Sequence, residues 1–362
     1  MTGQRPETAA PRVVALGGGH GLYASLSALR RVTSALTAVV TVADDGGSSG
    51  RLRAELGALP PGDLRMALAA LAGDDDWGRT WADLLQHRFG GSGALAGHPV
   101  GNLVLAGLAE MLDDPVAALD WTHRLLGGVG RVLPMSPVPL EIVARVASVD
   151  PDDPVPFRRI RGQVAVATTP GRVVEVHLVP EQPPACAAAT AAVRDADWVV
   201  LGPGSWFSSV LPHLLVPELR RALIETPARR LVSLNLAPQQ GETDDFAPEA
   251  YLEVLRSHAP ELRLDVVLAD EATVDDRSGL SRTAESMGAR LVLAPVATDD
   301  GTPRHDATRL AAVYRRLFVD AGWPGGAERV TGTGGEDRVP ASRATRSAVQ
   351  QNETGGGSRG WR

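Results

Sequence analysis

The segment VVALGGGHGLYASLSALRR, residues 13–31, has the pattern of a strand, a tight turn and a helix. Residues 13–16 are all apolar, as in a buried strand, and leucines at positions 22, 26 and 29 recur at helical spacing. Between them, GGGHG would let the backbone approach a ligand closely and leave N–H groups of the helix N-terminus free for an anion. The segment therefore predicts an α/β fold with a phosphate-binding turn, whose candidate residues are Gly17, Gly18, Gly19, His20 and Gly21.

This turn matches the dinucleotide-binding fingerprint only in part. The fingerprint requires a third glycine where Leu22 stands. The turn could also serve only to reverse the chain, and His20 could either donate to a phosphate or be solvated. The pattern favours an anion site without naming the nucleotide.

Strands and helices alternate along most of the chain, which predicts a Rossmann-like, mainly parallel sheet flanked by helices. Further strands are expected at residues 36–43, 198–202, 231–236, 264–269 and 290–294, and helices at 22–31, 63–72, 100–112, 116–126 and 307–321. The middle differs, because 131–134, 140–149, 163–168 and 172–179 are strand candidates without helical spacers. We expect them to form an antiparallel insertion or sheet extension over about residues 131–180.

The second expected strand ends in ADDGGSSGRLR, residues 43–53. An acidic side chain at that place holds a ribose hydroxyl in Rossmann proteins. The paired carboxylates could instead bind Mg²⁺ and the phosphates that it bridges, one could act as a base, or both could cap a turn. The candidate ligand-binding residues are Asp44, Asp45, Gly46, Gly47, Ser48 and Ser49, with Asp44 and Asp45 as the candidate Mg²⁺ ligands.

Four shorter motifs also meet the expected helices or strand ends. PPGDLR (60–65) places Asp63 for helix capping or for a site, and GHPVGN (97–102) offers an imidazole and an amide. LGPGS (201–205) offers a serine that could cap a helix, bind phosphate, or do both. Near the end of strand 231–236 an asparagine could read a base or sugar edge, and Glu242 in QQGET could add a carboxylate. The candidates from these motifs are Asp63, His98, Asn102, Gly202, Gly204, Ser205 and Asn235.

Composition excludes several classes of protein. All 36 basic residues are arginine, so the chain lacks the lysine that P-loop NTPases and Schiff-base enzymes require. A single cysteine, Cys186, excludes an internal disulfide and a cysteine-based zinc site. The formal net charge of −7 gives no general affinity for nucleic acid.

The expected domain organisation is one α/β domain over residues 12–323. Residues 1–11 and 324–362 are expected to be disordered, the latter because it is poor in large apolar residues. No segment has the length and apolarity of a membrane span, and the first residues lack the apolar core of a secretory signal. We therefore expect a cytoplasmic protein.

Taken in order, GGGHG, VTVADDGGSSGRLR, PPGDLR, GHPVGN, LGPGS and QQGET resemble the motifs of one family. These are the bacterial gluconeogenesis-factor proteins of the YvcK type, relatives of the 2-phospho-L-lactate transferases (CofD). The similarity spans roughly residues 13–294. Three places depart from the family pattern: His20 stands for threonine, Met66 for asparagine, and residues 237–239 for Thr-Gln-Pro.

The resemblance implies a Rossmann-like core and a regulatory protein that binds a UDP-sugar such as UDP-N-acetylglucosamine. It implies a role in cell shape and wall synthesis during growth on gluconeogenic carbon, with a cell-wall or regulatory protein partner or self-association as further expectations. The alternative is a transferase that joins a phospholactyl group to a deazaflavin with Mg²⁺. Both functions need the same phosphate cradle, so the sequence leaves them open, names no catalytic residue and allows Mg²⁺ to accompany the nucleotide-sugar.

Overall fold

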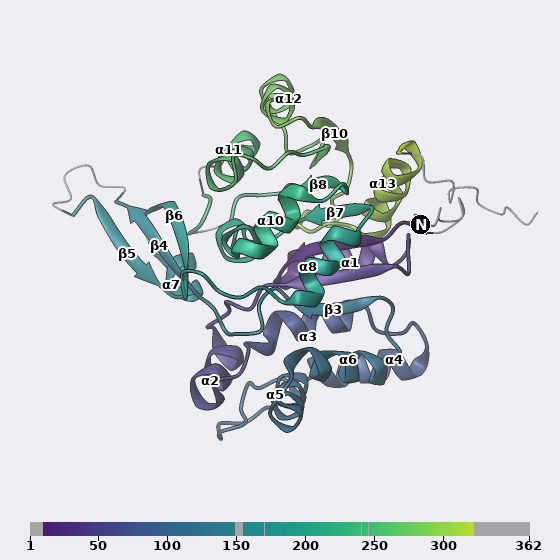
Figure 1. Cartoon of the computed structure of the whole chain (residues 1–362), viewed down its shortest axis with the longest axis vertical. Helices are drawn as coiled ribbons and strands as arrows, with labels where there is room; N and C mark the ends of the chain where they lie inside the picture. The colour runs from purple at the N-terminus through teal and green to yellow at the C-terminus, as the bar shows by residue number, and fades with distance from the viewer. Residues whose placement is uncertain (1–9, 149–154, 170, 240, 245, 322–362) are drawn as a thin grey trace, which may run out of the picture. The chain divides into compact units, whose positions relative to one another are not determined.

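In the part of the chain that the computed structural model describes, seven parallel strands form the main sheet, in the order β10-β9-β8-β7-β1-β2-β3 (Figure 1). The described residues are 10–148, 155–169, 171–239, 241–244 and 246–321. The strands are β1 (Val13–Gly17), β2 (Leu36–Val40), β3 (Arg131–Pro134), β7 (Trp198–Leu201), β8 (Arg229–Ser233), β9 (Val266–Asp270) and β10 (Arg290–Ala294). Every residue of β1, an inner strand of the sheet, is buried, as expected where helices cover both faces of a parallel sheet.

The helices supply the crossover connections that parallel strands require. α1 (Gly19–Leu29) leads from β1 to β2 and packs against α3 (Pro61–Ala70) and α13 (Ala307–Asp320). The others are α2 (Gly47–Leu56), α4 (Asp76–Gln86), α5 (Val100–Leu112), α6 (Pro115–Leu125), α7 (Gln163–Thr168), α8 (Ala187–Asp195), α9 (Pro212–Leu215), α10 (Pro217–Glu225), α11 (Pro248–His258) and α12 (Arg277–Ser286), with a π-helix η1 at Trp206–Val210. The leucines of α1 that set its spacing are buried, which confirms the strand–turn–helix prediction for the first unit.

A second, antiparallel sheet is inserted between β3 and α8. Within the described ranges it has three strands in the order β5-β4-β6, namely β4 (Glu141–Ala147), β5 (Phe157–Arg161) and β6 (Arg172–Val179). The α/β fold with an antiparallel insertion is thus confirmed. We refer to this second sheet as the small sheet.

Two details of the predicted insertion are wrong. The strand at 131–134 is β3 of the main sheet, because it follows the helical crossover from β2 and pairs with β2 in parallel. Residues 163–168 form helix α7 rather than a strand, because Gly162 turns the chain with a φ of +94° and a distant carboxylate caps the new helix. β5 was not expected, since its Arg-rich sequence is largely exposed and shows no buried face.

The two serines of ADDGGSSG do not lie in a loop. Helix α2 begins at Gly47, so the two serines of ADDGGSSG are helical. The flanks expected to be disordered lie outside the described residues, except for Ala10 and Pro11. No helix in the described residues is long and apolar enough to cross a membrane.

Candidate ligand-binding site

The turn between β1 and α1 lets three elements approach one another closely. A Cβ atom at Gly18 would lie 2.4 Å from Oδ2 of Asp63 and 2.5 Å from Cγ2 of Thr41. A Cβ atom at Gly21 would lie 2.1 Å from the carbonyl oxygen of Pro203. Only glycine fits at these two positions, and it brings the end of β2, the start of α3 and the turn after β7 together around the N-terminus of α1.

Asn235, which follows β8, holds the turn after β7. Its Oδ1 accepts a hydrogen bond from the Gly204 N–H at 2.9 Å, and its Nδ2 donates to the Gly204 carbonyl oxygen at 2.9 Å. The hydroxyl of Ser25 in α1 donates to the Gly202 carbonyl oxygen at 2.9 Å. The amide of Asn235, which the sequence suggested could read a base or sugar, therefore positions the backbone of this turn.

Ser205 caps the π-helix η1, which confirms one of the roles expected for it. Its Oγ accepts the Ser208 N–H at 3.2 Å and donates to Glu242, whose carboxylate oxygens lie 2.7 and 2.6 Å away. Burial raises the pKa of the Glu242 carboxyl, and the hydroxyls of Ser205 and Ser208 act in the opposite direction. Glu242 therefore ties the segment after β8 to the turn after β7.

A cavity of about 250 Å³, here called the small cavity, lies where these turns meet at the carboxyl ends of β1, β2 and β7. It brings together many of the sequence candidates and adds five residues that sequence reasoning missed. The lining candidates are Gly18, Gly19, His20, Gly21, Asp44, Asp63, Gly204 and Ser205, and the added residues are Thr41, Gln163, Ser208, Ser209 and Gln239. Gly18, the residue before α1, has no side chain that could cap the helix. Apart from the Gly19 N–H, which interacts with the Asp63 carboxyl, the first N–H groups of α1 and its dipole favour an anion here.

Two carboxyl groups face the small cavity, Asp44 and Asp63. Burial and, second, the charge of Asp44 raise the pKa of Asp63 to about 7, while the Gly19 N–H and the charge of Arg65 act in the opposite direction. Oδ1 of Asp44 accepts the Gly46 N–H at 2.9 Å. Such a pair suits Mg²⁺ or a shared proton, since hard cations prefer oxygen ligands.

Among the described residues no group of three or more His, Cys, Asp or Glu side chains could hold a metal ion. A Mg²⁺ ion at Asp44 and Asp63 would therefore take its remaining ligands from a phosphorylated ligand and from water.

A larger cavity of about 670 Å³ adjoins the small one on the other side of β1, beside the ends of β8 and β10. The two cavities share four wall residues, which are His20, Gly21, Gly204 and Gln239. The rest of the larger cavity is mainly apolar, formed by Tyr23, Ala24, Ser27, Pro203, Asn235, Leu236, Ala237, Pro238, Thr298, Pro303, Arg304, His305 and Ala307.

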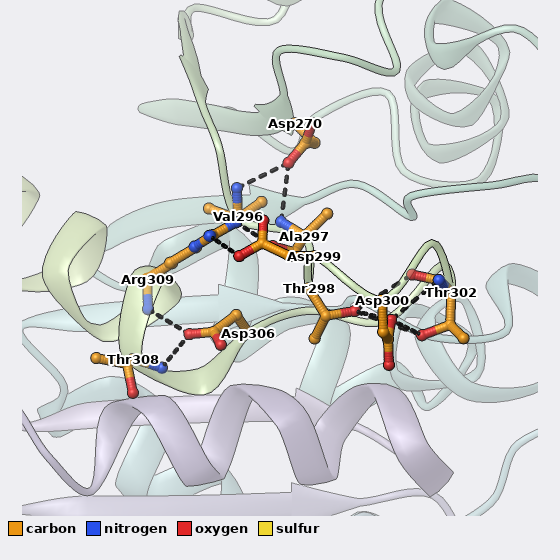
Figure 2. A network of polar contacts seen from close by, with 10 residues as sticks. All are labelled: Asp270, Val296, Ala297, Thr298, Asp299, Asp300, Thr302, Asp306, Thr308 and Arg309. Carbon is orange, nitrogen blue, oxygen red and sulfur yellow. Dashed lines mark hydrogen bonds and ion pairs between the residues drawn. The ribbon is translucent and has the colours of Figure 1, made fainter.

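Aspartates fix the loop after β10 that forms one wall of the larger cavity (Figure 2). Oδ2 of Asp270, at the end of β9, accepts the N–H groups of Val296 at 2.7 Å and Ala297 at 2.9 Å. Asp306 caps α13 by accepting two N–H groups of its first turn at 2.8 Å each. Burial lowers the pKa of His305 in this wall to about 4, so its imidazole is neutral near pH 7. The loop is thus a pre-formed wall.

Asp45 serves a different part of the molecule from Asp44. Its Oδ1 accepts the Val164 N–H at 3.0 Å, in the first turn of α7, and in the described structure it lines neither cavity. Asp63 rather than Asp45 shares the small cavity with Asp44, while the Mg²⁺ site expected at Asp44 and Asp45 stays a prediction.

Next to α3, a buried network joins three further candidates, and a fourth, Ser49, makes a separate hydrogen bond to α3. Oγ of Ser48 lies 2.7 Å from Nδ1 of His98 and accepts from Nδ2 of Asn102 at 2.9 Å. Nε of Arg65 donates to Oδ1 of Asn102 at 2.9 Å, and Oγ of Ser49 accepts a backbone N–H of α3 at 3.1 Å. These side chains hold α2, α3 and α5 together, and in the described part of the chain they line neither cavity. The candidates Gly17 at the end of β1, Gly46 and Gly47 at the start of α2, and Gly202 after β7 also line neither cavity there.

The profile of the 2-phospho-L-lactate transferase CofD matches residues 13–310 of this chain. The chain belongs to this family. It is 60% identical over 304 residues to the "Putative gluconeogenesis factor" of Mycobacterium tuberculosis, covering 83% of this chain and 88% of that protein. It is 34% identical over 312 residues to the "Gluconeogenesis factor" of Listeria monocytogenes, covering 83% and 94%.

A solved structure has a similar fold. A protein member of the UPF0052 family from Bacillus halodurans superposes with a TM-score of 0.74 at 30% identity, covering 86% of this chain and 99% of that one. The family resemblance drawn from the motifs and the α/β fold class are both confirmed.

Two of the three departures from the family motifs lie in the cavity walls. His20, which is exposed, and Gln239 line both cavities, and Ala237 and Pro238 line the larger one. Met66 lines neither cavity in the described structure. Two of the three places where the sequence was expected to depart from the family motifs thus line the cavities.

Proposed function

We propose that this CofD-family protein binds a nucleoside-diphosphate sugar, and that its ligand is a UDP-sugar such as UDP-N-acetylglucosamine. The observation that carries the proposal is the small polar cavity at the N-terminus of α1, joined to a larger, mainly apolar one. The N–H groups of the glycine turn and the hydroxyl of Ser209 suit a diphosphate, whereas the hydroxyls of Ser205 and Ser208 donate to Glu242. Apolar walls with a few polar groups suit a nucleoside.

The position of the larger cavity favours one orientation of the ligand. A Rossmann protein would place the ribose at the end of the second strand, next to Asp44 and Asp45. Here the space for a nucleoside lies across β1, toward β8 and β10. We infer that the nucleoside occupies this side and that the sugar or Mg²⁺ end of the ligand faces Asp44 and Asp63.

Calorimetry tests the binding proposal directly. The full-length protein is titrated with UDP-N-acetylglucosamine, GDP and NAD, each with and without Mg²⁺. We expect saturable binding of the UDP-sugar and weaker binding of the other two. Tighter binding of NAD than of the UDP-sugar would contradict the proposal.

We propose that the ligand-bound protein has a regulatory rather than a catalytic role. It would act in the cytoplasm, through a partner that is a cell-wall protein or a regulatory protein. The relatives named as gluconeogenesis factors support this role. Deleting the gene should impair growth or cell shape on gluconeogenic carbon and spare growth on glucose. Equal growth and unchanged morphology on both carbon sources would count against it.

The second candidate is a CofD-like transferase that acts on a nucleoside-diphosphate-activated, phospholactyl-type substrate. The observation that favours it is the pair of carboxyl groups in the small cavity: two neighbouring carboxylates suit Mg²⁺, and a carboxyl whose pKa is raised to about 7 suits proton transfer. Incubation with such a substrate, Mg²⁺ and a deazaflavin acceptor discriminates the two functions. Conversion of the acceptor, followed by chromatography, would favour the transferase, and an unchanged acceptor would favour the binding protein.

A further inference from the structure

Helix α7 connects the small cavity to the small sheet. Gln163, the first residue of α7, lines the cavity and comes from the inserted segment. The next residue, Val164, donates its N–H to Oδ1 of Asp45 at 3.0 Å. Asp45 directly follows Asp44, which lines the same cavity. The N-terminal end of α7 is therefore attached to the cavity wall in two ways.

The other end of α7 rests on a second wall segment. A Cβ atom at Gly241 would lie 2.0 Å from the carbonyl oxygen of Ala167, and Gly241 has a φ of +82°. Near it in sequence, Gln239 lines the small cavity and Glu242 binds Ser205. Both ends of α7 thus contact segments that shape the cavity.

On its remaining side α7 packs against β4 and β5, at the end of the small sheet nearest the rest of the fold (Figure 1). Val166 of α7 is fully buried, and the N–H of Gly162 donates to the carbonyl oxygen of Ile142 in β4 at 2.8 Å. A change in the position of α7 cannot leave this sheet unaffected, because packed side chains move together.

We propose that a ligand in the small cavity hydrogen-bonds to the Gln163 amide and thereby stabilises α7 and the small sheet, so that this sheet reports occupancy of the site. A glutamine amide can donate to a phosphate or exchange hydrogen bonds with a sugar hydroxyl. A partner protein that binds the stabilised form of the small sheet more tightly would also raise the affinity for the ligand. By linkage, the ligand raises the affinity for that partner by the same factor. This inference rests on the proposed binding of a nucleotide-sugar.

Hydrogen–deuterium exchange on the full-length protein tests the connection. With saturating UDP-N-acetylglucosamine, we expect amides of residues 141–147 and 157–168 to exchange at least about threefold more slowly. The Gln163→Ala variant should bind roughly fivefold more weakly, because one hydrogen bond is lost, and alanine preserves the helix. At equal saturation it should lose the protection of β4 and β5. The matched control is Gln182→Ala, an exposed glutamine after β6, which should keep both affinity and protection.

The outcomes separate this inference from the proposed function. Calorimetric binding without protection of the small sheet in the wild type would overturn the inference and leave the binding proposal standing. Wild-type protection that persists in Gln163→Ala would overturn the route through Gln163. No calorimetric binding of UDP-N-acetylglucosamine would overturn the proposed function, and this inference with it.

Discussion

Asp44 and Asp45 are neighbours in the chain, but their carboxylates serve different parts of the fold. Asp44 lines the small cavity and binds the Gly46 N–H at 2.9 Å, whereas Asp45 binds the Val164 N–H of α7 at 3.0 Å. One is available to a ligand or to Mg²⁺, and the other stabilises the inserted segment.

Replacing each of the two aspartates by asparagine should therefore give different results. Asp44→Asn removes a charge from the small cavity, so affinity for UDP-N-acetylglucosamine with Mg²⁺ should fall about tenfold or more and lose its response to Mg²⁺. Asp45→Asn keeps an acceptor for the Val164 N–H and should change affinity by less than about twofold. Calorimetry measures both, and a larger effect at Asp45 than at Asp44 would contradict this division of roles.

The raised pKa of Asp63 predicts a dependence of stability on pH. An acid whose pKa rises from 3.8 to about 7 keeps in the folded state a proton that the unfolded chain loses. Its contribution to stability is therefore lost as the pH rises from about 4 through about 7.

Asp63→Asn cannot ionise, so without ligand or Mg²⁺ it should be more stable than the wild type at about pH 8 and equally stable at about pH 4. One pKa unit corresponds to about 1.4 kcal/mol of stability. Because water reaches the half-buried carboxyl and weakens the effect, we expect a stability difference of about 1–2 kcal/mol at the higher pH. Urea denaturation at both pH values measures the difference. A variant less stable than the wild type at the higher pH would show that the charged form is favoured.

Close packing at Gly21 predicts a large effect from a single methyl group. Gly21→Ala would place Cβ against the Pro203 carbonyl oxygen and should lower the free energy of unfolding by about 1–3 kcal/mol, with loss of ligand binding. Gly107→Ala is the matched control, because Gly107 also lies in a helix but has open space around it. The control should be stabilised by about 0.5–1 kcal/mol. Equal effects of the two variants in thermal unfolding would contradict the close approach of α1 to the turn after β7.

The main sheet could be predicted from sequence because its strands are short apolar runs that alternate with helices of regular spacing. The insertion could be predicted only in outline. Residues 163–168 have the sequence QVAVAT, which suits a strand. They form a helix instead, and its N-terminus is capped by Asp45, which lies 119 positions from Val164 in the sequence. β5 is exposed and carries Phe157 beside three arginines, so it lacks the apolar pattern by which a strand is recognised.

The site could be predicted where backbone geometry leaves a trace in the sequence, as in the glycines of the turns after β1 and β7. It could not be predicted where polar side chains bind one another. Ser48, His98 and Asn102 have the residue types of a ligand site, but their hydrogen-bonding groups are used within a buried network. Gln163 was missed because its approach to the cavity depends on the tertiary position of α7.

The assignment of the nucleoside to the larger cavity predicts a selective effect of filling that cavity. Ala24→Trp should reduce the affinity for UDP at least about tenfold by occupying space beside Tyr23, while inorganic diphosphate binds as before. Ala54→Trp, at an exposed position of α2, is the control and should change neither affinity. If Ala24→Trp weakens the binding of inorganic diphosphate and of UDP equally, the nucleoside and the diphosphate do not occupy separate cavities as proposed.

The position of the diphosphate in a crystal structure of the protein with UDP-N-acetylglucosamine tests the central proposal most directly. The account predicts both phosphorus atoms in the small cavity, between residues 18–21 at the start of α1 and residues 204–209 after β7, with the uracil in the larger cavity beside Tyr23. A nucleotide bound outside both cavities, or one whose diphosphate lies away from the glycine turn, would contradict it.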